Sequence, residues 1–304
     1  MFTIVGAGLA GLTAARLLTD AGEKVEVFET RDYIGGNCSF GHGAHFFHTS
    51  NDDVWSFVNR FEQWRPTEHR VVADTDAGQF AVPCLEDMSD DRIIDLFFEG
   101  YTQKMWGMSW HDLPLSVRNR VWLRGTTGRY FSDVHEGVPD LGWFLFFEHL
   151  SDGIKVHTGC GSNDWHRAVG RTGGRVIYTG RLDALFESVL GPLSFKSLWF
   201  QKINLALQHP VVNECRMERP YIRTVDYGQM PRFHSYPRTY REFPAVCTGD
   251  AIPYYPGFDF DLHARYVKMA KETGIIPLGR LAEYKYLDMD KTIESAMRIV
   301  KSLL

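Results

Sequence analysis

The first 18 residues, MFTIVGAGLAGLTAARLL (residues 1–18), contain the pattern that decides the fold. An apolar run at residues 2–5 leads into Gly6, Gly8 and Gly11, the spacing of a glycine turn between a strand and a helix. Such a turn presents backbone N–H groups and a helix N-terminus to a pyrophosphate. The spacing alone is a weak signal, because an α/β domain can use the same glycines only for a close crossing of helix and strand.

A second apolar run, residues 25–28, ends in Glu29, close to the offset expected for an acid that hydrogen-bonds an adenosine ribose. A carboxylate at this position argues against a cofactor that carries a 2′-phosphate. The stretch RDYIGGN (residues 31–37) follows directly and resembles the second fingerprint of FAD-binding proteins. The two strands together favour FAD over NAD.

Composition restricts the remaining classes of function. The chain has 304 residues and a net charge of −5 that is spread along it, which disfavours nucleic-acid binding. Its five cysteines are scattered and form no CxxC pair, as expected in a reduced compartment. The first strand begins at residue 2 and leaves no room for a signal peptide, and no apolar run is long enough to span a membrane. We therefore expect a cytoplasmic protein that does not enter a membrane.

Periodicity predicts an interleaved order of elements. Helices are expected at residues 51–61, 89–107, 181–190 and 292–304, and strands at 69–74, 78–82, 175–180, 197–207, 211–217, 245–251 and 274–280. Because strands that resemble the first sheet recur late in the chain, we expect discontinuous domains.

Several clusters permit both a functional and a structural interpretation. His42, His45 and His48 have a spacing that suggests metal binding, but they lack a carboxylate partner, so we expect no metal and a loop that lines a pocket. Tyr101 and Trp106 either stack on a base or pack in the core. The stretch PRFHSYPRTYR (residues 231–241) is interpreted as a surface hairpin, with nucleic-acid contact as the alternative.

Eight blocks, taken in order, closely resemble the UDP-galactopyranose mutase family: GAGLAG, RDYIGGN, GAHFFHT, FFEGYTQKMWG, RYF, PYIRT, IPYYP and GRLAEYKYLDMD. The resemblance extends from the first strand to the last helix, and FFEGYTQKMWG and GRLAEYKYLDMD are its most specific parts. It implies an isomerase, active with reduced FAD, that interconverts the pyranose and furanose forms of a UDP-sugar, with UDP-galactose as the expected substrate. In this family the reaction passes through a covalent flavin N5–sugar adduct without net redox change.

The resemblance also implies an α/β fold, with a FAD-binding Rossmann-like domain, an inserted antiparallel sheet and a reduced helical domain. We expect residues 1–66, 170–195 and 270–304 to form the FAD-binding domain and residues 84–130 the reduced helical, substrate-binding segment. Residues 67–83, 131–169 and 196–269 are expected to form the antiparallel sheet domain.

Matching motifs imply the roles of individual residues. Arg120 and Arg223 correspond to the arginines that clamp the leaving diphosphate. His48 corresponds to a residue that faces the flavin and either stabilises its reduced form or only packs against it. The implied substrate-binding residues are Phe97, Tyr101, Thr102, Trp106, Tyr130, Tyr255, Tyr286, Asp288 and His69. The implied cofactor-binding residues are Gly6, Gly8, Gly11, Glu29, Arg31, Gly35, Gly36, Asn37, His45, Arg280, Leu287, Asp288 and Met289.

The chain departs from the family pattern in ways that bear on assembly and substrate. Only about a dozen residues separate Pro83 from Phe97, where bacterial members carry helices used for dimerisation, so we expect a monomer or a dimer through another surface. His69 stands where the family places an Asn close to the uridine, and VDYGQ replaces the usual residues after PYIRT. A different nucleotide sugar is therefore an alternative substrate.

Two further alternatives remain at this stage. One is a FAD oxidoreductase of the amine-oxidase type, and the other is a flavin- or nucleotide-binding protein without turnover. For a mutase, the expected partners are a UDP-sugar and a cellular reductant of the flavin such as NAD(P)H. A role of the product in glycan biosynthesis is implied by the family alone.

Overall fold

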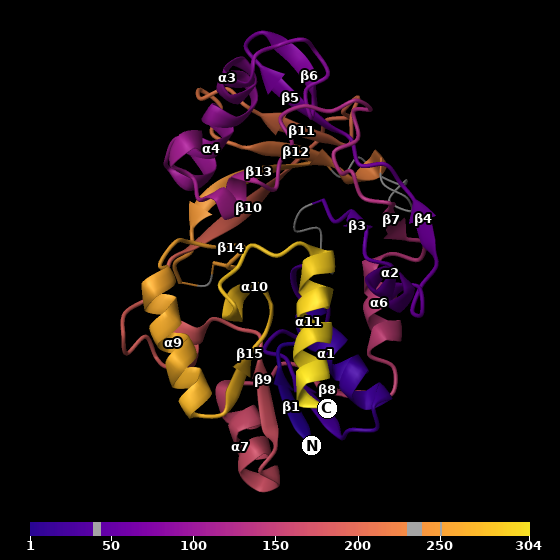
Figure 1. Ribbon diagram of the computed structural model, residues 1–304, viewed down its shortest axis with the longest axis vertical. Helices are drawn as coiled ribbons and strands as arrows, with labels where there is room; N and C mark the ends of the chain where they lie inside the picture. The colour runs from indigo at the N-terminus through magenta and orange to yellow at the C-terminus, as the bar shows by residue number, and fades with distance from the viewer. Residues whose placement is uncertain (39–43, 230–238, 250) are drawn as a thin grey trace.

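The structure is a computed structural model that describes residues 1–38, 44–229, 239–249 and 251–304. Figure 1 shows a five-stranded sheet surrounded by helices at one end of the molecule and a seven-stranded sheet at the other. A small three-stranded sheet lies along one side between them. The functional residues predicted from the sequence come from the elements where these parts meet.

The five-stranded sheet is parallel, has the order β15-β9-β1-β2-β8 and confirms the Rossmann-like fold. Its strands are β1 (Phe2–Val5), β2 (Val25–Phe28), β8 (Lys155–His157), β9 (Arg175–Tyr178) and β15 (Ile275–Pro277). The helices around it are α1 (Leu9–Asp20), α6 (Trp143–Leu150), α7 (Ser162–Thr172), α9 (Phe260–Glu272) and α11 (Met289–Leu303). The central strand β1 is buried on both faces, with only Val5 partly exposed, because helices cover both sides of such a sheet. Strands β9 and β15 show that the chain returns to this sheet, as predicted.

Backbone atoms lie so close to the glycine turn after β1 that side chains have no room there. Gly6 has φ +105°, a conformation that disfavours any other residue, and a Cβ on Gly11 would overlap the carbonyl oxygen of Gly6. Gly8 forms an isolated bridge with Gly35, so the turn after β1 lies against the turn after β2. No side chain caps the N-terminus of α1. The first N–H groups of this helix can therefore serve a ligand.

The seven-stranded sheet has the order β14-β10-β13-β12-β11-β5-β6. Its strands are β5 (Val71–Thr75), β6 (Gly78–Val82), β10 (Phe195–Ile203), β11 (Val211–Glu214), β12 (Arg223–Asp226), β13 (Thr239–Val246) and β14 (Tyr255–Pro256). The expectation of an antiparallel sheet needs one correction, because β11 and β5 pair in parallel. In the β12–β13 pair, Arg223 lies opposite Glu242 and Thr224 opposite Arg241, so these pairs point to opposite faces.

The helix expected at residues 89–107 is present but divided. It consists of α3 (Asp90–Ile93), a π-helical turn η2 (Ile94–Glu99) and α4 (Gly100–Trp106). Ser89 caps its start and Gly107, at φ +75°, ends it. Gly100 allows the helix to touch the sheet, because a Cβ there would overlap the carbonyl oxygen of Cys215. Lys104 then donates to three sheet-end carbonyls at 2.8–2.9 Å.

The three-stranded antiparallel sheet β3-β7-β4 was not predicted, and it consists of β3 (Phe47–Thr49), β7 (His135–Pro139) and β4 (Trp64–Pro66). The remaining short elements are α2 (Asp52–Val58), α5 (Leu115–Arg118), α8 (Leu182–Leu185), α10 (Gly279–Ala282), η1 (Gly36–Cys38), η3 (Trp110–Asp112) and η4 (Tyr227–Gln229). Within the described residues, no helix combines the length and apolar character needed to cross a membrane.

Three sequence predictions were wrong in part. The helix at residues 181–190 ends at Leu185, because Glu187 and Ser188 adopt left-handed φ angles of 52° and 54°. Of the described residues in the strand predicted at 245–251, only Ala245 and Val246 lie in a strand, as the last two residues of β13; residue 250 lies outside the described residues. Residues 155–157, expected in the antiparallel sheet, pair in parallel with β2 instead. The rest of the proposed domain division stays a prediction.

We expect Gly11→Ala to destabilise the protein by about 2–3 kcal/mol, because the new Cβ would displace backbone. It should also lower the amount of flavin that copurifies. Gly170→Ala, in an open position on α7, is the matched control and should be neutral or slightly stabilising. Urea denaturation and flavin absorbance per chain measure both effects, and equal behaviour of the two variants would contradict the role of the turn.

Candidate functional site

Three connected hollows form the candidate site. The first, which we call the dinucleotide groove, is lined by the two glycine turns and has a volume of about 380 Å³. The second, the clamp cavity, contains Arg120 and Arg223 and has a volume of about 260 Å³. The third, the aromatic cavity, is lined by Phe97, Tyr101 and Trp106 and has a volume of about 100 Å³. Residues shared by the groove and the clamp cavity are His45, Tyr254, Arg280 and Met289. Residues shared by the clamp cavity and the aromatic cavity are Arg120, Val121, Tyr130, Asn213, Arg223, Tyr255 and Tyr286. A ligand can thus extend from the glycine turn to the aromatic cavity.

The dinucleotide groove collects most of the predicted cofactor-binding residues: Gly6, Gly8, Glu29, Arg31, Gly35, Gly36, Asn37, His45, Arg280, Leu287 and Met289. Gly11 lies behind the groove and acts through packing, and Asp288 lines the clamp cavity instead. A Cβ on Gly36 would lie 3.2 Å from Gly8 Cα, so side chains at these two turns would fill the cradle. The uncapped N-terminus of α1 supplies N–H donors at the same place. These features fit the pyrophosphate of FAD.

Glu29 lies at the end of β2 with 7% of its surface exposed. Its carboxylate accepts hydrogen bonds from the backbone N–H groups of Ala7 at 2.7 Å and Arg31 at 2.9 Å. These two bonds hold the carboxylate between the two glycine turns. The predicted bond to a ribose stays a prediction.

The other end of the groove is formed by the turn before α11. Arg280 donates to the carbonyl oxygens of Leu287 at 3.0 Å and Tyr254 at 3.1 Å. Helix α11 starts at Met289 without a side-chain cap, and Met289 and Thr292 line the groove. The positive end of this 15-residue helix can therefore stabilise negative charge on a bound group.

Arg120 enters the clamp cavity just after α5. Its guanidinium carbon lies 3.4 Å from the centre of the Tyr286 ring, and Nη2 forms an ion pair with Asp288 Oδ1. Burial alone would lower the pKa of Arg120, but Tyr286 and Asp288 outweigh it and raise the pKa above its ordinary value. Burial opposes ionisation of Asp288, and Arg120 more than compensates, so the pKa of Asp288 is lowered. Both groups are charged at neutral pH.

Arg223 reaches the same cavity from β12. It donates to the hydroxyl of Tyr101 at 2.9 Å and to Asn213 Oδ1 at 3.2 Å. Its Nη1 lies 3.6 Å from a carboxylate oxygen of Glu242, whose side chain is 1% exposed. Burial raises the pKa of Glu242, and Arg223 only partly offsets this.

Sequence reasoning missed Glu242. In the sequence, Glu242 is a charged residue within a strand whose side chains alternate between the two faces of the sheet. That it points toward the cavity is known only from the strand register, which places Glu242 opposite Arg223.

The aromatic cavity is lined by all four predicted residues of the divided helix: Phe97, Tyr101, Thr102 and Trp106. Tyr255 and Tyr286 stack on each other at 4.5 Å and form the wall toward the clamp cavity. Trp106 lies 6.0 Å from Tyr255, ring centre to ring centre. Flat apolar walls with tyrosine hydroxyls suit a planar base.

His48 lines the clamp cavity, where Nδ1 lies 2.7 Å from Asp133 Oδ2 and the ring stacks on Phe131 at 3.6 Å. The sequence did not point to Asp133, which is 85 residues away along the chain. His45 Nε2 lies 2.9 Å from the carbonyl oxygen of Asn37. His42 lies outside the described residues, and among those described no cluster of His, Cys, Asp and Glu could hold a metal ion.

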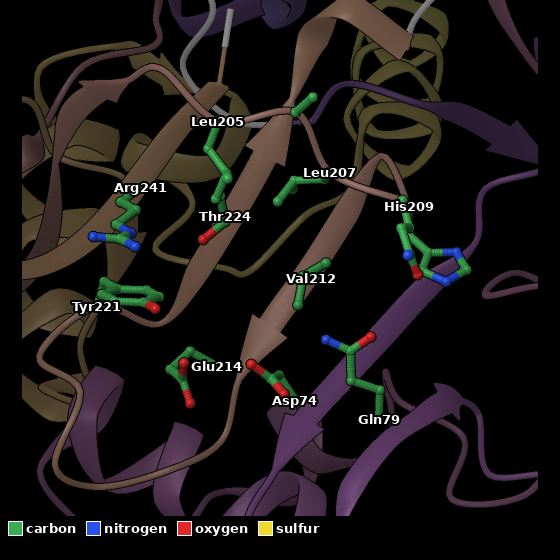
Figure 2. Close-up of a pocket in the computed structure, with 12 residues that line it drawn as sticks. Asp74, Gln79, Leu205, Leu207, His209, Val212, Glu214, Tyr221, Thr224 and Arg241 are labelled. Carbon is green, nitrogen blue, oxygen red and sulfur yellow. The ribbon is translucent and has the colours of Figure 1, made fainter. Parts of the chain in front are cut away.

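A separate hollow of about 250 Å³ lies on the outer face of the seven-stranded sheet. Figure 2 shows Val212 and Thr224 on the strands, with Leu205 and Leu207 beside them and Arg241 next to Tyr221. Its acids, Asp74 and Glu214, are already paired with Arg216. None of the predicted site residues lines this hollow, so it does not belong to the candidate site.

The Arg120–Asp288 pair predicts a pH-dependent contribution to stability. Because the pKa of Asp288 is lowered in the folded state, its stabilisation is present above the unfolded pKa and is lost as pH falls through the folded value. We expect Asp288→Asn to lower the free energy of unfolding by about 1–2 kcal/mol at pH 6. The difference from the unsubstituted protein should shrink below about pH 4.5. Urea denaturation between pH 7 and pH 3.5 tests this, and a difference independent of pH would contradict it.

Comparison with known proteins agrees with this geometry. A family model described as UDP-galactopyranose mutase matches residues 96–286, and a model of a NAD(P)-binding Rossmann-like domain matches residues 4–61. A probable UDP-galactopyranose mutase of Klebsiella pneumoniae is 28% identical, over 99% of this chain and 94% of that protein. A dTDP-fucopyranose mutase of Escherichia coli is also 28% identical, over 97% of this chain and 96% of that protein.

A solved structure of reduced UDP-galactopyranose mutase has the same fold, with a TM-score of 0.73, 13% identity and coverage of 99% of this chain and 95% of that one. The alignment with the Klebsiella protein extends over 362 positions, more than the 304 residues present here, so the relative contains insertions that this chain lacks. The mutase model covers more than half of the chain, including both clamp arginines and the aromatic cavity. The chain therefore belongs to the UDP-galactopyranose mutase family of isomerases, as a shortened member.

Proposed function

We propose that this protein interconverts the pyranose and furanose forms of a UDP-sugar, with UDP-galactose as the substrate and FAD in its reduced state as the cofactor. The observation that carries the proposal is the placement of Arg120 and Arg223 in one cavity, between a dinucleotide groove and an aromatic cavity. A nucleotide sugar has the matching order of parts: base, diphosphate and sugar.

The two arginines would bind and neutralise the diphosphate. A guanidinium group donates two parallel hydrogen bonds to phosphate oxygens. Its electrostatic attraction to the phosphate increases in a site that excludes water. The negative charge on the diphosphate grows as its bond to the anomeric carbon weakens. Interactions that strengthen with this charge lower the barrier to departure and to return of the diphosphate.

Tyrosines orient the clamp. The hydroxyl of Tyr101 holds Arg223, and the ring of Tyr286 supports the flat face of Arg120. The base would enter the aromatic cavity, which keeps the released nucleotide close to the sugar between the two steps. Residues from the helical segment and from the turn before α11 thus act on one substrate.

Reduced FAD would supply a nucleophilic nitrogen, N5, toward the sugar. The chain contributes the electrostatic setting: Arg280 and the N-terminus of α11 face the end of the groove that adjoins the clamp cavity. Asp133 holds His48 in a fixed orientation in the same cavity. Arg280 and the helix N-terminus favour a negatively charged group at this junction.

The site also bears on the alternatives. An amine-oxidase type of enzyme needs an apolar substrate channel, whereas three arginines and three carboxylates, Asp133, Glu242 and Asp288, line this cavity. A mutase for a different nucleotide sugar remains the second candidate, because a relative is named dTDP-fucopyranose mutase. We further propose a cytoplasmic protein, reduced by NAD(P)H, that is a monomer or uses a dimer surface other than the missing helices.

The first test is to incubate the anaerobically reduced protein with UDP-galactofuranose and to follow UDP-galactopyranose by anion-exchange chromatography. Conversion that disappears when the flavin is oxidised would support the proposal. A flavin spectrum that responds to UDP, without conversion, would indicate another nucleotide sugar. No response to either compound would contradict the proposal and favour the oxidoreductase or the inactive protein.

Arg120→Ala and Arg223→Ala should each lower kcat/KM on the order of 100-fold or more, because charge on the leaving diphosphate is no longer compensated. Arg241→Ala is the matched control: it lies on the neighbouring strand β13 but on the opposite face, beside Tyr221. It should leave kcat/KM within about twofold. Full activity of either clamp variant would show that the diphosphate binds elsewhere.

A further inference from the structure

A further hollow, which we call the lateral hollow, lies beside the candidate site and has no part in the proposed function. Its volume is about 710 Å³, more than that of each of the three hollows that would hold the cofactor and the substrate. Helices α9 and α11 form two of its walls, and Figure 1 shows α10 between them. The turn at residues 283–287 and α5 complete the lining. A hollow of this volume can hold a small molecule.

The lateral hollow shares one wall with the aromatic cavity. Trp106, Val117 and Tyr286 line both of them. The other residues that the sequence assigned to the substrate line the aromatic cavity or the clamp cavity instead, His69 among them. The base and the diphosphate would therefore occupy the far side of this wall, and the lateral hollow stays open to a different ligand.

Aromatic rings form much of the lining of the lateral hollow. The ring centre of Phe258 lies 5.3 Å from that of Trp106, and the ring centre of Phe260 lies 6.2 Å from that of Tyr284. Phe260 opens helix α9 and is 50% exposed. A flat apolar group that covers these rings would remove their surface from water and could stack on them.

The charged groups of the lateral hollow leave an excess of positive charge. Among the described residues that line it, Lys285 and Arg298 are cations with mostly exposed side chains, and Glu283 is the one acid. Both cations share this carboxylate, at 3.7 Å and 3.5 Å. Glu283 Oε2 also accepts hydrogen bonds from the N–H of Gly279 at 2.9 Å and the hydroxyl of Ser295 at 2.7 Å. One positive charge at the rim is therefore not compensated, and it suits an anion.

His263 contributes a further flat surface without adding charge. It lies on α9, with Nε2 2.9 Å from the carbonyl oxygen of Ala282, and its ring stacks on Tyr284 at 5.1 Å. Burial lowers the pKa of His263, so the ring is neutral at neutral pH. The interior of the hollow is thus apolar and flat, and its charge lies at the rim.

We propose that the lateral hollow is a second ligand site, separate from the substrate site, for an organic anion with a flat, ring-containing body. The rings would lie against Phe258 and Phe260, and the anionic group would face Lys285 and Arg298. Because ion pairs at an exposed rim contribute little, the rings would supply most of the affinity and the rim the preference for an anion.

The test uses the flavin-loaded protein and three probes. The probe 8-anilinonaphthalene-1-sulfonate carries rings and an anionic group, N-phenyl-1-naphthylamine has the same rings without the sulfonate, and methanesulfonate has the anionic group alone. Equilibrium dialysis with chromatographic quantification measures binding without interference from the flavin spectrum. We expect the ring sulfonate to bind, the neutral amine to bind about fivefold more weakly and methanesulfonate not to compete.

Two variants with matched controls locate the bound probe. Phe260→Ala should weaken binding of the ring sulfonate about tenfold. Phe144→Ala removes an equally exposed ring from α6, outside the hollow, and should change the affinity by less than about twofold. Arg298→Gln should weaken binding about threefold and reduce the preference for the sulfonate over the amine. Arg167→Gln removes a similarly exposed arginine from α7 and should have no such effect.

Equal affinities in Phe260→Ala and Phe144→Ala would overturn the proposal, because the probe would then bind elsewhere. So would displacement of the ring sulfonate by saturating UDP, which would place the probe in the aromatic cavity. Absence of binding, or equal binding of the charged and the neutral probe, would contradict a site for an organic anion. Failure of UDP to bind would count against the proposed function alone, since the response of the variants to the probe does not depend on UDP.

Discussion

The guanidinium groups of Arg120 and Arg223 lie in one cavity, and the arrangement of the site follows from the need to neutralise them. Like charges repel strongly where water is excluded, so each arginine requires a nearby anion. Arg120 is paired with Asp288 and Arg223 with Glu242. Each also touches a tyrosine, Tyr286 or Tyr101. Asp288 and Tyr286 come from the turn before α11, Glu242 from β13 and Tyr101 from α4, so the cavity forms only when both large sheets and the helical segment are in place.

The connection between these parts depends on a few close contacts rather than on a large helical domain. Gly100 lets the divided helix touch the end of the seven-stranded sheet, and Lys104 binds the carbonyls there. These contacts hold Tyr101 and Trp106 beside Arg223 and Tyr255. The short connection between Pro83 and Phe97 is therefore compatible with an intact aromatic cavity, because the residues that position it lie after the shortened region.

The sequence was sufficient where the signal is local. The glycine turn after β1, the strand 25–28 and the capped start at Ser89 each depend on neighbouring residues, and each was predicted. The motif matches also predicted one shared site for Arg120, Arg223, Tyr255 and Tyr286. In the structure, all four line the clamp cavity. The catalytic roles of these residues stay predictions, because a structure gives the positions of the residues and not the rate of a reaction.

The sequence was insufficient where structure depends on distant pairing. Strand β8 is three residues long and gains its place only from β2, 129 positions earlier for the Glu26–Lys155 pair. The sheet β3-β7-β4 combines segments that are individually too short to recognise. Glu242 acquires its role from Arg223 on the neighbouring strand β12, and Asp133 acquires its role from His48, 85 positions away in the chain. A local apolar run led to the opposite error at residues 245–249, where the described chain forms no strand beyond Val246.

The two ion pairs of the clamp are not equivalent, and this asymmetry bears on how a diphosphate would enter. Asp288 is 30% exposed and follows a turn, so water can solvate its carboxylate when Arg120 changes partner. Glu242 is 1% exposed within a strand, and its release would leave a buried charge without compensation. Under the proposed function, Arg223 would therefore be the fixed half of the clamp and Arg120 the exchangeable half. A diphosphate that replaced Asp288 at Arg120 would require no rearrangement of the sheet, so the cavity would keep its shape while the charge on the phosphate changed.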